Sequence, residues 1–241
     1  MNHSASLSAP SRRTRRIVLL GLALLGLGSA LFVVRRPLMM SAPMCLAGRW
    51  HGCFGTFNGV VFMTLVALPL AVLVVWALAR RRRAAGASGT SAWRMSLAEV
   101  GMVHGTVPFL WMTMMPGAAA GIVPGRVSLV PVRDLLTMGP VGIVGNLLVF
   151  AALGFFAPMR FAALASVPRI LAFGAGCSVL VETAQYVLRL DRVSSVDDVL
   201  VNAAGAALAA LASRRWWRTS VEAPEAPEEP SDRPRPVTAP A

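Results

Sequence analysis

Long apolar runs, separated by short polar or arginine-rich stretches, fill the first 213 residues of the chain. A helix needs about 20 apolar residues to cross a hydrocarbon core of about 30 Å. The segments that approach this length are 17–34, 57–79, 97–115, 140–158, 168–188 and 196–213. Because a helix satisfies its own backbone hydrogen bonds in lipid, we predict an all-α, polytopic transmembrane helical bundle of about six spans.

Three of these segments carry an ambiguity. Glu99 and His104 interrupt 97–115, and 196–213 is short and begins with two aspartates. The segment 17–34 follows the basic sequence RRTRR, which is also typical of a secretory signal peptide. Its apolar run is longer than the core of a usual signal peptide, and no small-residue cleavage site precedes RRPLMM. We therefore favour a retained membrane anchor over a cleaved signal.

Composition agrees with a membrane protein and gives it an orientation. The chain is 56% apolar and only 14% charged, whereas soluble domains contain about 25% charged residues. Its net charge of +12 comes from arginines grouped between apolar segments, which argues against nucleic acid as a partner. Six alternating spans place most arginines on the cytoplasmic side, as the positive-inside rule requires. We predict a multi-pass protein of the cell membrane with both termini cytoplasmic.

A five-span topology is the alternative, and it would place the arginines of 214–218 outside and weaken the charge asymmetry. We divide the chain into a basic cytoplasmic N-terminus (1–16), a transmembrane helical domain (17–213) and a cytoplasmic tail (214–241). The tail is rich in Pro, Ala and Glu and has no periodic apolar face, so we predict that it is disordered.

The segment 35–56 is predicted to be an outer loop, and it contains Cys45, His51 and Cys53. A disulfide between the two cysteines would suit the oxidising side of the membrane, and an incidental role stays equally open. The spacing of the cysteines matches no metal-ligand pattern.

Strongly polar residues recur at one level in the last three predicted spans. The helical rise of 1.5 Å per residue places Asn146, Glu182 and Asn202 about 9 Å below the outer end of their helices. Gln185 and Arg189 share the helical face of Glu182, and Asp198 and Gly205 share the face of Asn202. Polar side chains inside a span usually face the bundle interior or a water-filled cavity. Gly205 would let another helix approach closely.

The neighbouring outer loops add Arg133 and Asp134, and also Arg189, Asp191, Arg192 and Asp197. We therefore predict an outward-facing polar pocket in which the binding residues are Asn146, Glu182, Gln185, Arg192, Asp197, Asp198 and Asn202. No catalytic residue can be named, and we expect no metal and no cofactor.

Structural explanations remain open for each of these residues. Ser195 and Asp198 have the spacing of a capping box, and acidic residues suit the first turn of a helix. The two asparagines could serve only to hydrogen-bond neighbouring helices. Glu182 would then be half of a buried ion pair with Arg189 or Arg133. Glu99 and His104 lie in the inner half of their span, where a structural role is the simpler interpretation.

The pattern across 133–213 resembles the VanZ-like family of bacterial membrane proteins. The resemblance is carried by GNLLVFAALGF (145–155), by SVLVETAQYVLRLDRVSSVDDVLVNAAGAALAAL (178–211) and, more loosely, by VRDLL (132–136). The matching positions are Asn146, Phe150, Gly154, Glu182, Gln185, Arg192, Asp197, Asp198, Asn202 and Gly205. The chain departs from the family pattern at Ala152, where proline is usual, and at Ala209, where glycine is usual. Both positions concern helix kinking and close packing.

The family takes its name from a determinant of low-level teicoplanin resistance. The resemblance implies an effect on the cell envelope or on glycopeptide susceptibility, with an envelope lipid or a glycopeptide as ligand. A membrane enzyme acting on a lipid-linked envelope substrate is an alternative, although no nucleophile–base pair, histidine metal site or phosphate loop supports it. A small transporter is another, but polar residues are sparse in the inner half of the spans. The sequence indicates no oligomeric state.

Overall fold

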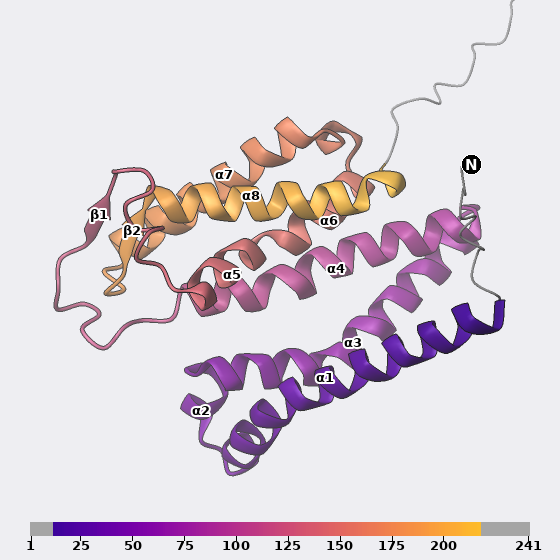
Figure 1. Cartoon of the computed structure of the whole chain (residues 1–241), viewed down its shortest axis with the longest axis horizontal. Helices are drawn as coiled ribbons and strands as arrows, with labels where there is room; N and C mark the ends of the chain where they lie inside the picture. Colours follow the sequence, from indigo (N-terminus) through magenta and orange to yellow (C-terminus); the bar gives the residue numbers. More distant parts are fainter. Residues whose placement is uncertain (1–11, 218–241) are drawn as a thin grey trace, which may run out of the picture.

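A computed structural model describes residues 12–217, and Figure 1 shows its long helices running back and forth along one axis. The helices are α1 (Arg12–Leu46), α2 (Trp50–Phe54), α3 (Phe57–Ala84), α4 (Gly89–Thr113), α5 (Pro140–Val149), α6 (Ala151–Arg160), α7 (Val167–Val187) and α8 (Val196–Ser213). Two 3-10 turns, η1 (Ala162–Leu164) and η2 (Arg214–Trp216), follow α6 and α8. The predicted all-α bundle is therefore confirmed.

Within residues 12–217, five helical segments are long and apolar enough to cross a membrane. They are Arg16–Leu46, Phe57–Ala84, Pro140–Arg160, Val167–Val187 and Val196–Trp216. The predicted segment 97–115 falls mostly in α4, which is less apolar than these five segments and is not among them. Its 25 residues nevertheless extend about 37 Å, and Figure 1 shows it running the length of the bundle beside α5 and α6.

The charge of Glu99 is neutralised inside the bundle. Glu99 Oε2 lies 2.5 Å from Arg82 Nη2 of α3, and Glu99 Oε1 lies 2.5 Å from Arg160 Nε of α6. These ion pairs join three helices near the end of the bundle at which α3 and α6 end and α4 begins (Figure 1). Figure 1 places the start of α1 and the end of α8 at that same end.

Short polar side chains define where several helices begin. Thr56 precedes α3 and accepts a hydrogen bond from the backbone N–H of Gly59 at 3.0 Å. Ser88 and Ser166 cap α4 and α7 in the same way. These caps satisfy backbone donors that have no partner within the first helical turn.

The first helix is longer than predicted. We expected a span of 17–34 followed by an outer loop over 35–56, but α1 continues to Leu46 and α2 forms within the expected loop. Arg35 and Arg36 end the apolar run without ending the helix. Charged side chains mark where a helix leaves the hydrocarbon, but they do not interrupt its backbone hydrogen bonds. A disulfide joins Cys45 of α1 to Cys53 of α2, with the Cα atoms 5.5 Å apart.

The predicted terminal regions are described only in part. Residues 12–16 of the expected N-terminal region already belong to α1, and 214–216 of the expected tail form η2. The remainder, 1–11 and 218–241, lies outside the described residues, so the prediction of a disordered tail stays a prediction.

The predicted span 140–158 is interrupted at Phe150, which separates α5 from α6. This break forms although the proline of the family pattern is replaced by Ala152. Glycines then bring α5 and α6 against α8: a Cβ on Gly205 would overlap the carbonyl oxygen of Leu147, and one on Gly154 would overlap that of Ala206. The close approach expected at Gly205 is confirmed. The core beside these crossings contains Val149, Phe150, Ala157, Ile170, Ala206 and Ala210.

A two-stranded sheet, which the sequence did not predict, closes the other end of the bundle. Strand β1 (Arg126–Ser128) pairs in parallel with β2 (Val193–Ser195), so that Arg126 lies opposite Val193. The pairing joins the long connection between α4 and α5 to the short connection between α7 and α8 (Figure 1).

Candidate functional site

A polar cavity of about 340 Å³ lies at this sheet-bearing end of the bundle. It is lined by Thr113, Arg126, Asn146, Val181, Glu182, Gln185, Asp191, Arg192, Val193, Asp198 and Asn202. The lining comes from the end of α4, from α5, α7 and α8, and from the connections that contain β1 and β2. The cavity therefore unites six of the seven residues predicted to form a binding pocket, and Asp197 is the exception.

Two side chains of α7 are held firmly at the cavity. Glu182 is only 8% exposed, and its Oε2 accepts a hydrogen bond from the backbone N–H of Ser195 at 3.1 Å. Gln185 Nε2 donates to the carbonyl oxygen of Thr113 at 2.9 Å, which ties α7 to the end of α4. These contacts fix the orientation of both side chains.

The ion pair with Arg189 or Arg133, one of the two interpretations left open for Glu182, is absent among residues 12–217. Helix α7 ends at Val187, and Arg189 follows in a left-handed turn with φ of 50°, so it leaves the helical face that Glu182 and Gln185 share. Within residues 12–217, neither Arg189 nor Arg133 forms a salt bridge with Glu182.

Helix α8 supplies Asp198 and Asn202. Asn146 Nδ2 donates a hydrogen bond to Asp198 Oδ1 across the α5–α8 contact. Asn202 Nδ2 donates to Ser178 Oγ of α7 at 2.8 Å. Both asparagines thus link neighbouring helices, as the structural interpretation expected, and both also line the cavity. Asn202 is 3% exposed, and its Oδ1 atom is buried without a hydrogen-bond partner in the described part of the chain.

Asp197 has a supporting position instead of lining the cavity. It is 1% exposed, and its carboxylate accepts backbone hydrogen bonds from Val132 at 2.6 Å, Asp134 at 2.8 Å and Leu135 at 2.9 Å. A carboxylate that accepts hydrogen bonds from several backbone N–H groups satisfies donors that would otherwise need water as their partner. Asp197 therefore anchors the connection before α5 to the start of α8.

Ser195 caps α8, although the arrangement differs from a capping box. Its Oγ accepts from the backbone N–H of Asp197 at 3.2 Å and donates to Asp134 Oδ2 at 2.6 Å. The backbone N–H of Ser195 is bound by Glu182 and not by Asp198. The hydroxyls of Ser128 and Ser195 lower the pKa of Asp134 below its ordinary value, because they stabilise the ionised form.

Loop residues complete the cavity, and the prediction included Arg192 but left out Asp191 and Arg126. Asp191, with φ of 55°, accepts from the backbone N–H of Ala119 at 3.0 Å and forms an ion pair with Arg126 at 3.2 Å. Arg192 Nη2 donates to the carbonyl oxygen of Met115 at 3.3 Å. The sequence already places Asp191 among the charged residues of the outer loops. Arg126 and Thr113 belong to no helical pattern of polar residues, so the sequence could not identify them.

Hydrogen-bond acceptors and cations occupy different parts of this cavity. Glu182, Gln185 and Asn202 are buried, whereas Arg126 and Arg192 are exposed. In the described range no cluster of three His, Cys, Asp or Glu residues could hold a metal ion. The arrangement suits the recognition of a polar or charged molecule through oxygen acceptors at the base and arginines at the rim.

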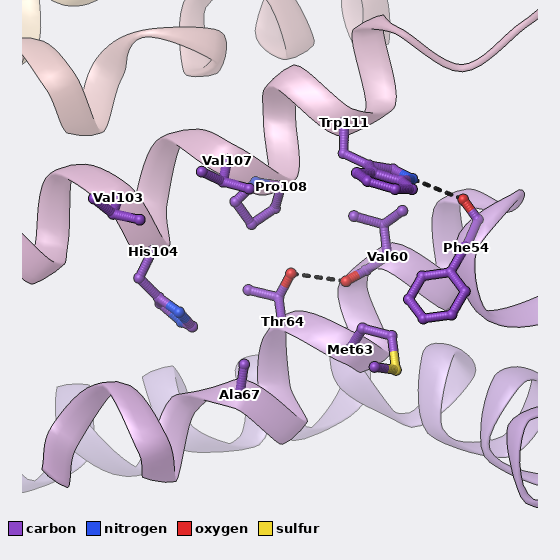
Figure 2. A pocket seen from close by; sticks show the side chains of 10 residues that line it. All are labelled: Phe54, Val60, Met63, Thr64, Ala67, Val103, His104, Val107, Pro108 and Trp111. Carbon is purple, nitrogen blue, oxygen red and sulfur yellow. Dashed lines mark hydrogen bonds between the residues drawn. The ribbon is translucent and has the colours of Figure 1, made fainter. Parts of the chain in front are cut away.

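A second cavity, of about 280 Å³, lies between α3 and α4 and is largely apolar. Figure 2 shows Val60, Val107 and Trp111 facing it, with His104 directed toward the same space. Thr64 Oγ donates to the carbonyl oxygen of Val60 at 2.7 Å, and Trp111 Nε1 donates to that of Phe54 at 2.8 Å. Since these two donors are already used, His104 is the side chain of this lining that offers a polar contact to a ligand.

Comparison with known proteins identifies the part of the chain that carries the polar cavity. Residues 106–217 match the family described as VanZ/LLP1. The match extends the resemblance seen in 133–213 to include the end of α4. No curated protein and no solved structure matches the chain. The matched range contains every residue that lines the polar cavity. Residues 106–217 therefore form a VanZ-like region, and the five apolar helices found within residues 12–217 identify the chain as a membrane protein.

Proposed function

We propose that this protein acts on the cell envelope from the outer face of the cell membrane, by binding an envelope molecule in the polar cavity. The observation that carries the proposal is the convergence of six polar residues, from three helices and a loop, on one cavity within the family-matched region. Polar groups at membrane depth are costly unless they are paired or serve a site. An altered susceptibility to glycopeptides such as teicoplanin is the expected consequence.

The distribution of arginines supports an outward-facing cavity. Arginine clusters lie where α3 ends (80–83), where α6 ends and α7 begins (160 and 169), and after α8 (214–215). Figure 1 places all these helix ends away from β1 and β2. Short arginine-rich connections favour the cytoplasmic side. The sheet-bearing end, with the cavity, is then on the outer side.

Susceptibility testing of isosteric variants examines this proposal. A deletion strain is complemented with the wild-type protein, Glu182→Gln or Asp198→Asn, and minimal inhibitory concentrations are measured for teicoplanin and related lipoglycopeptides. We expect both variants to resemble the deletion strain, because each loses a cavity carboxylate at nearly unchanged volume. Glu99→Gln is the matched control, since it removes a carboxylate at the opposite end of the bundle.

Protein levels in the membrane are compared by immunoblot, so that loss of function is separated from loss of the protein. Wild-type susceptibility of both cavity variants at equal protein levels would refute an envelope role for the cavity.

A further inference from the structure

The base of the polar cavity contains two carboxylates, and the guanidinium that lies nearest to them along the lining, that of Arg192, is not in salt-bridge contact with either. Glu182 and Asp198 both line it, yet none of the salt bridges within the described part of the chain includes either residue. Asp191, the other carboxylate of the lining, is already paired with Arg126. Burying a carboxylate without a cationic partner is unfavourable. Counted over the whole lining, three carboxylates face two guanidinium groups, so the cavity lacks one positive charge.

Three oxygen atoms at this base remain available as acceptors. Among residues 12–217, the hydrogen bonds of Glu182 and Asp198 use Glu182 Oε2 and Asp198 Oδ1, which leaves Oε1 and Oδ2 of the same groups. Asn202 adds Oδ1, which is buried without a partner. A buried amide oxygen without a hydrogen bond is uncommon in folded proteins. It is an indication, independent of the two carboxylates, that a donor from outside the chain completes the site.

The rim of the cavity has the opposite character. Arg192 is exposed and donates to the carbonyl oxygen of Met115, a neutral acceptor. Arg126, also exposed, contributes a second guanidinium that is partly neutralised by Asp191. An anionic group at the rim would meet fork-shaped donors that suit carboxylates and phosphates.

We propose that the cavity binds a zwitterionic head group, with a primary ammonium against Glu182, Asp198 and Asn202 and an anionic group against Arg192 and Arg126. An ammonium supplies one positive charge and three N–H donors, which match the missing charge and the three available oxygens. A sugar hydroxyl would supply donors but no charge. This assignment rests on the proposed function and specifies the chemical class of its ligand.

Two sources in a cell envelope share this chemistry: a phosphoethanolamine lipid, and a free amino acid or peptide end. The common test is binding to the purified full-length chain in detergent, measured by calorimetry. The probes are phosphoethanolamine and phosphocholine, which carry the same phosphate and a cationic nitrogen but differ in N–H donors. D-alanine, and nanodiscs of phosphatidylethanolamine or phosphatidylcholine, then distinguish the two sources.

We expect phosphoethanolamine or D-alanine to bind at least about tenfold more tightly than phosphocholine, since hydrogen bonds to charged groups are the strong ones. Glu182→Gln and Asp198→Asn should each remove this preference, and Glu99→Gln should retain it. Arg192→Gln changes an exposed side chain that should not affect folding, and it should weaken binding of both phosphate probes.

Equal binding of phosphocholine and phosphoethanolamine would overturn the proposal. It would also be overturned if none of the amine probes bound to a chain whose cooperative thermal unfolding shows that it is folded. A third contrary result would be that Mg²⁺ or Ca²⁺ displaces the amine probes and that binding of the cation is lost in Glu182→Gln. Each of these results leaves the susceptibility test of the cavity untouched, so failure of the ligand assignment is distinguishable from failure of the proposed function.

Discussion

Adjacent aspartates at the start of α8 have different roles. Asp197 is buried and binds three backbone N–H groups of the connection before α5, whereas Asp198 lines the cavity and accepts from Asn146. Consecutive residues point to different sides of a helix, so this division follows from their positions. One aspartate holds the wall in place and the other presents an oxygen to the cavity.

This division predicts different effects on stability. Asp197→Ala leaves three partly buried backbone N–H donors without their acceptor, and we expect it to lower the free energy of unfolding by about 3 kcal/mol. Asp198→Asn keeps the side-chain volume and an oxygen that can accept from Asn146, so its unfolding temperature should stay close to that of the wild type. Thermal unfolding in detergent, followed by tryptophan fluorescence, compares the two. Equal stability of Asp197→Ala and Asp198→Asn would contradict an anchoring role for Asp197.

At the residue scale, helical spacing predicted most of the cavity. Asn146, Glu182, Gln185, Asp198 and Asn202 lie on regular helices, where depth and face follow from the rise and turn per residue. Loop residues could not be placed in this way, because their positions depend on left-handed turns and on the β1–β2 pairing. Arg126 was therefore missed, and Asp197 was assigned to the pocket that it only supports.

Among the elements, the contact between α5 and α8 depends on glycine. Gly205 lies so close to Leu147 that an added Cβ would overlap the carbonyl oxygen of that residue. The same contact positions Asn146 beside Asp198. Close backbone approach through small residues is a common way to pack membrane helices, since lipid competes equally for larger apolar side chains.

Gly205→Ala therefore tests the crossing. The added methyl group must displace the backbone of Leu147, so we expect the free energy of unfolding to fall by about 1–3 kcal/mol or more. Ligand binding at the cavity should also weaken, because the same contact positions Asn146 and Asp198. Gly176→Ala is the matched control, because an added Cβ there would meet no heavy atom within 4 Å and alanine favours the helical conformation of α7. Unfolding temperature and monodispersity on size-exclusion chromatography are the measurements. A Gly205→Ala protein as stable as Gly176→Ala would show that the helices do not cross this closely.

Hydrophobic patterning predicted which elements exist better than it predicted their ends. The apolar runs located all the long helices, but α1 extends to Leu46, and the span 140–158 breaks at Phe150. An apolar run reports where hydrocarbon can surround a helix, whereas helix ends depend on caps and tertiary contacts. The short β1–β2 pair has no alternating pattern long enough to be recognised.

For the whole molecule, the role of α4 decides the topology. Its Glu99 is neutralised by Arg82 and Arg160, so the residue that weakens its apolar character does not oppose burial in the bundle. If α4 crosses the membrane with the five apolar segments, both ends of the described chain lie on one side, as Figure 1 shows for the bundle itself. The cavity and the arginine-rich connections then face opposite sides of the membrane.

Cysteine labelling in intact cells tests this arrangement. Leu129 is highly exposed beside β1, and Ala85 is exposed just after α3, near the opposite end of the bundle. In a Cys177→Ser background, a membrane-impermeant maleimide should label Leu129→Cys in intact cells and Ala85→Cys only after permeabilisation. Cys45 and Cys53 are joined in a disulfide and should not react unless reductant is added. The reverse labelling pattern would place the cavity in the cytoplasm, and binding of an envelope molecule from outside would then be untenable.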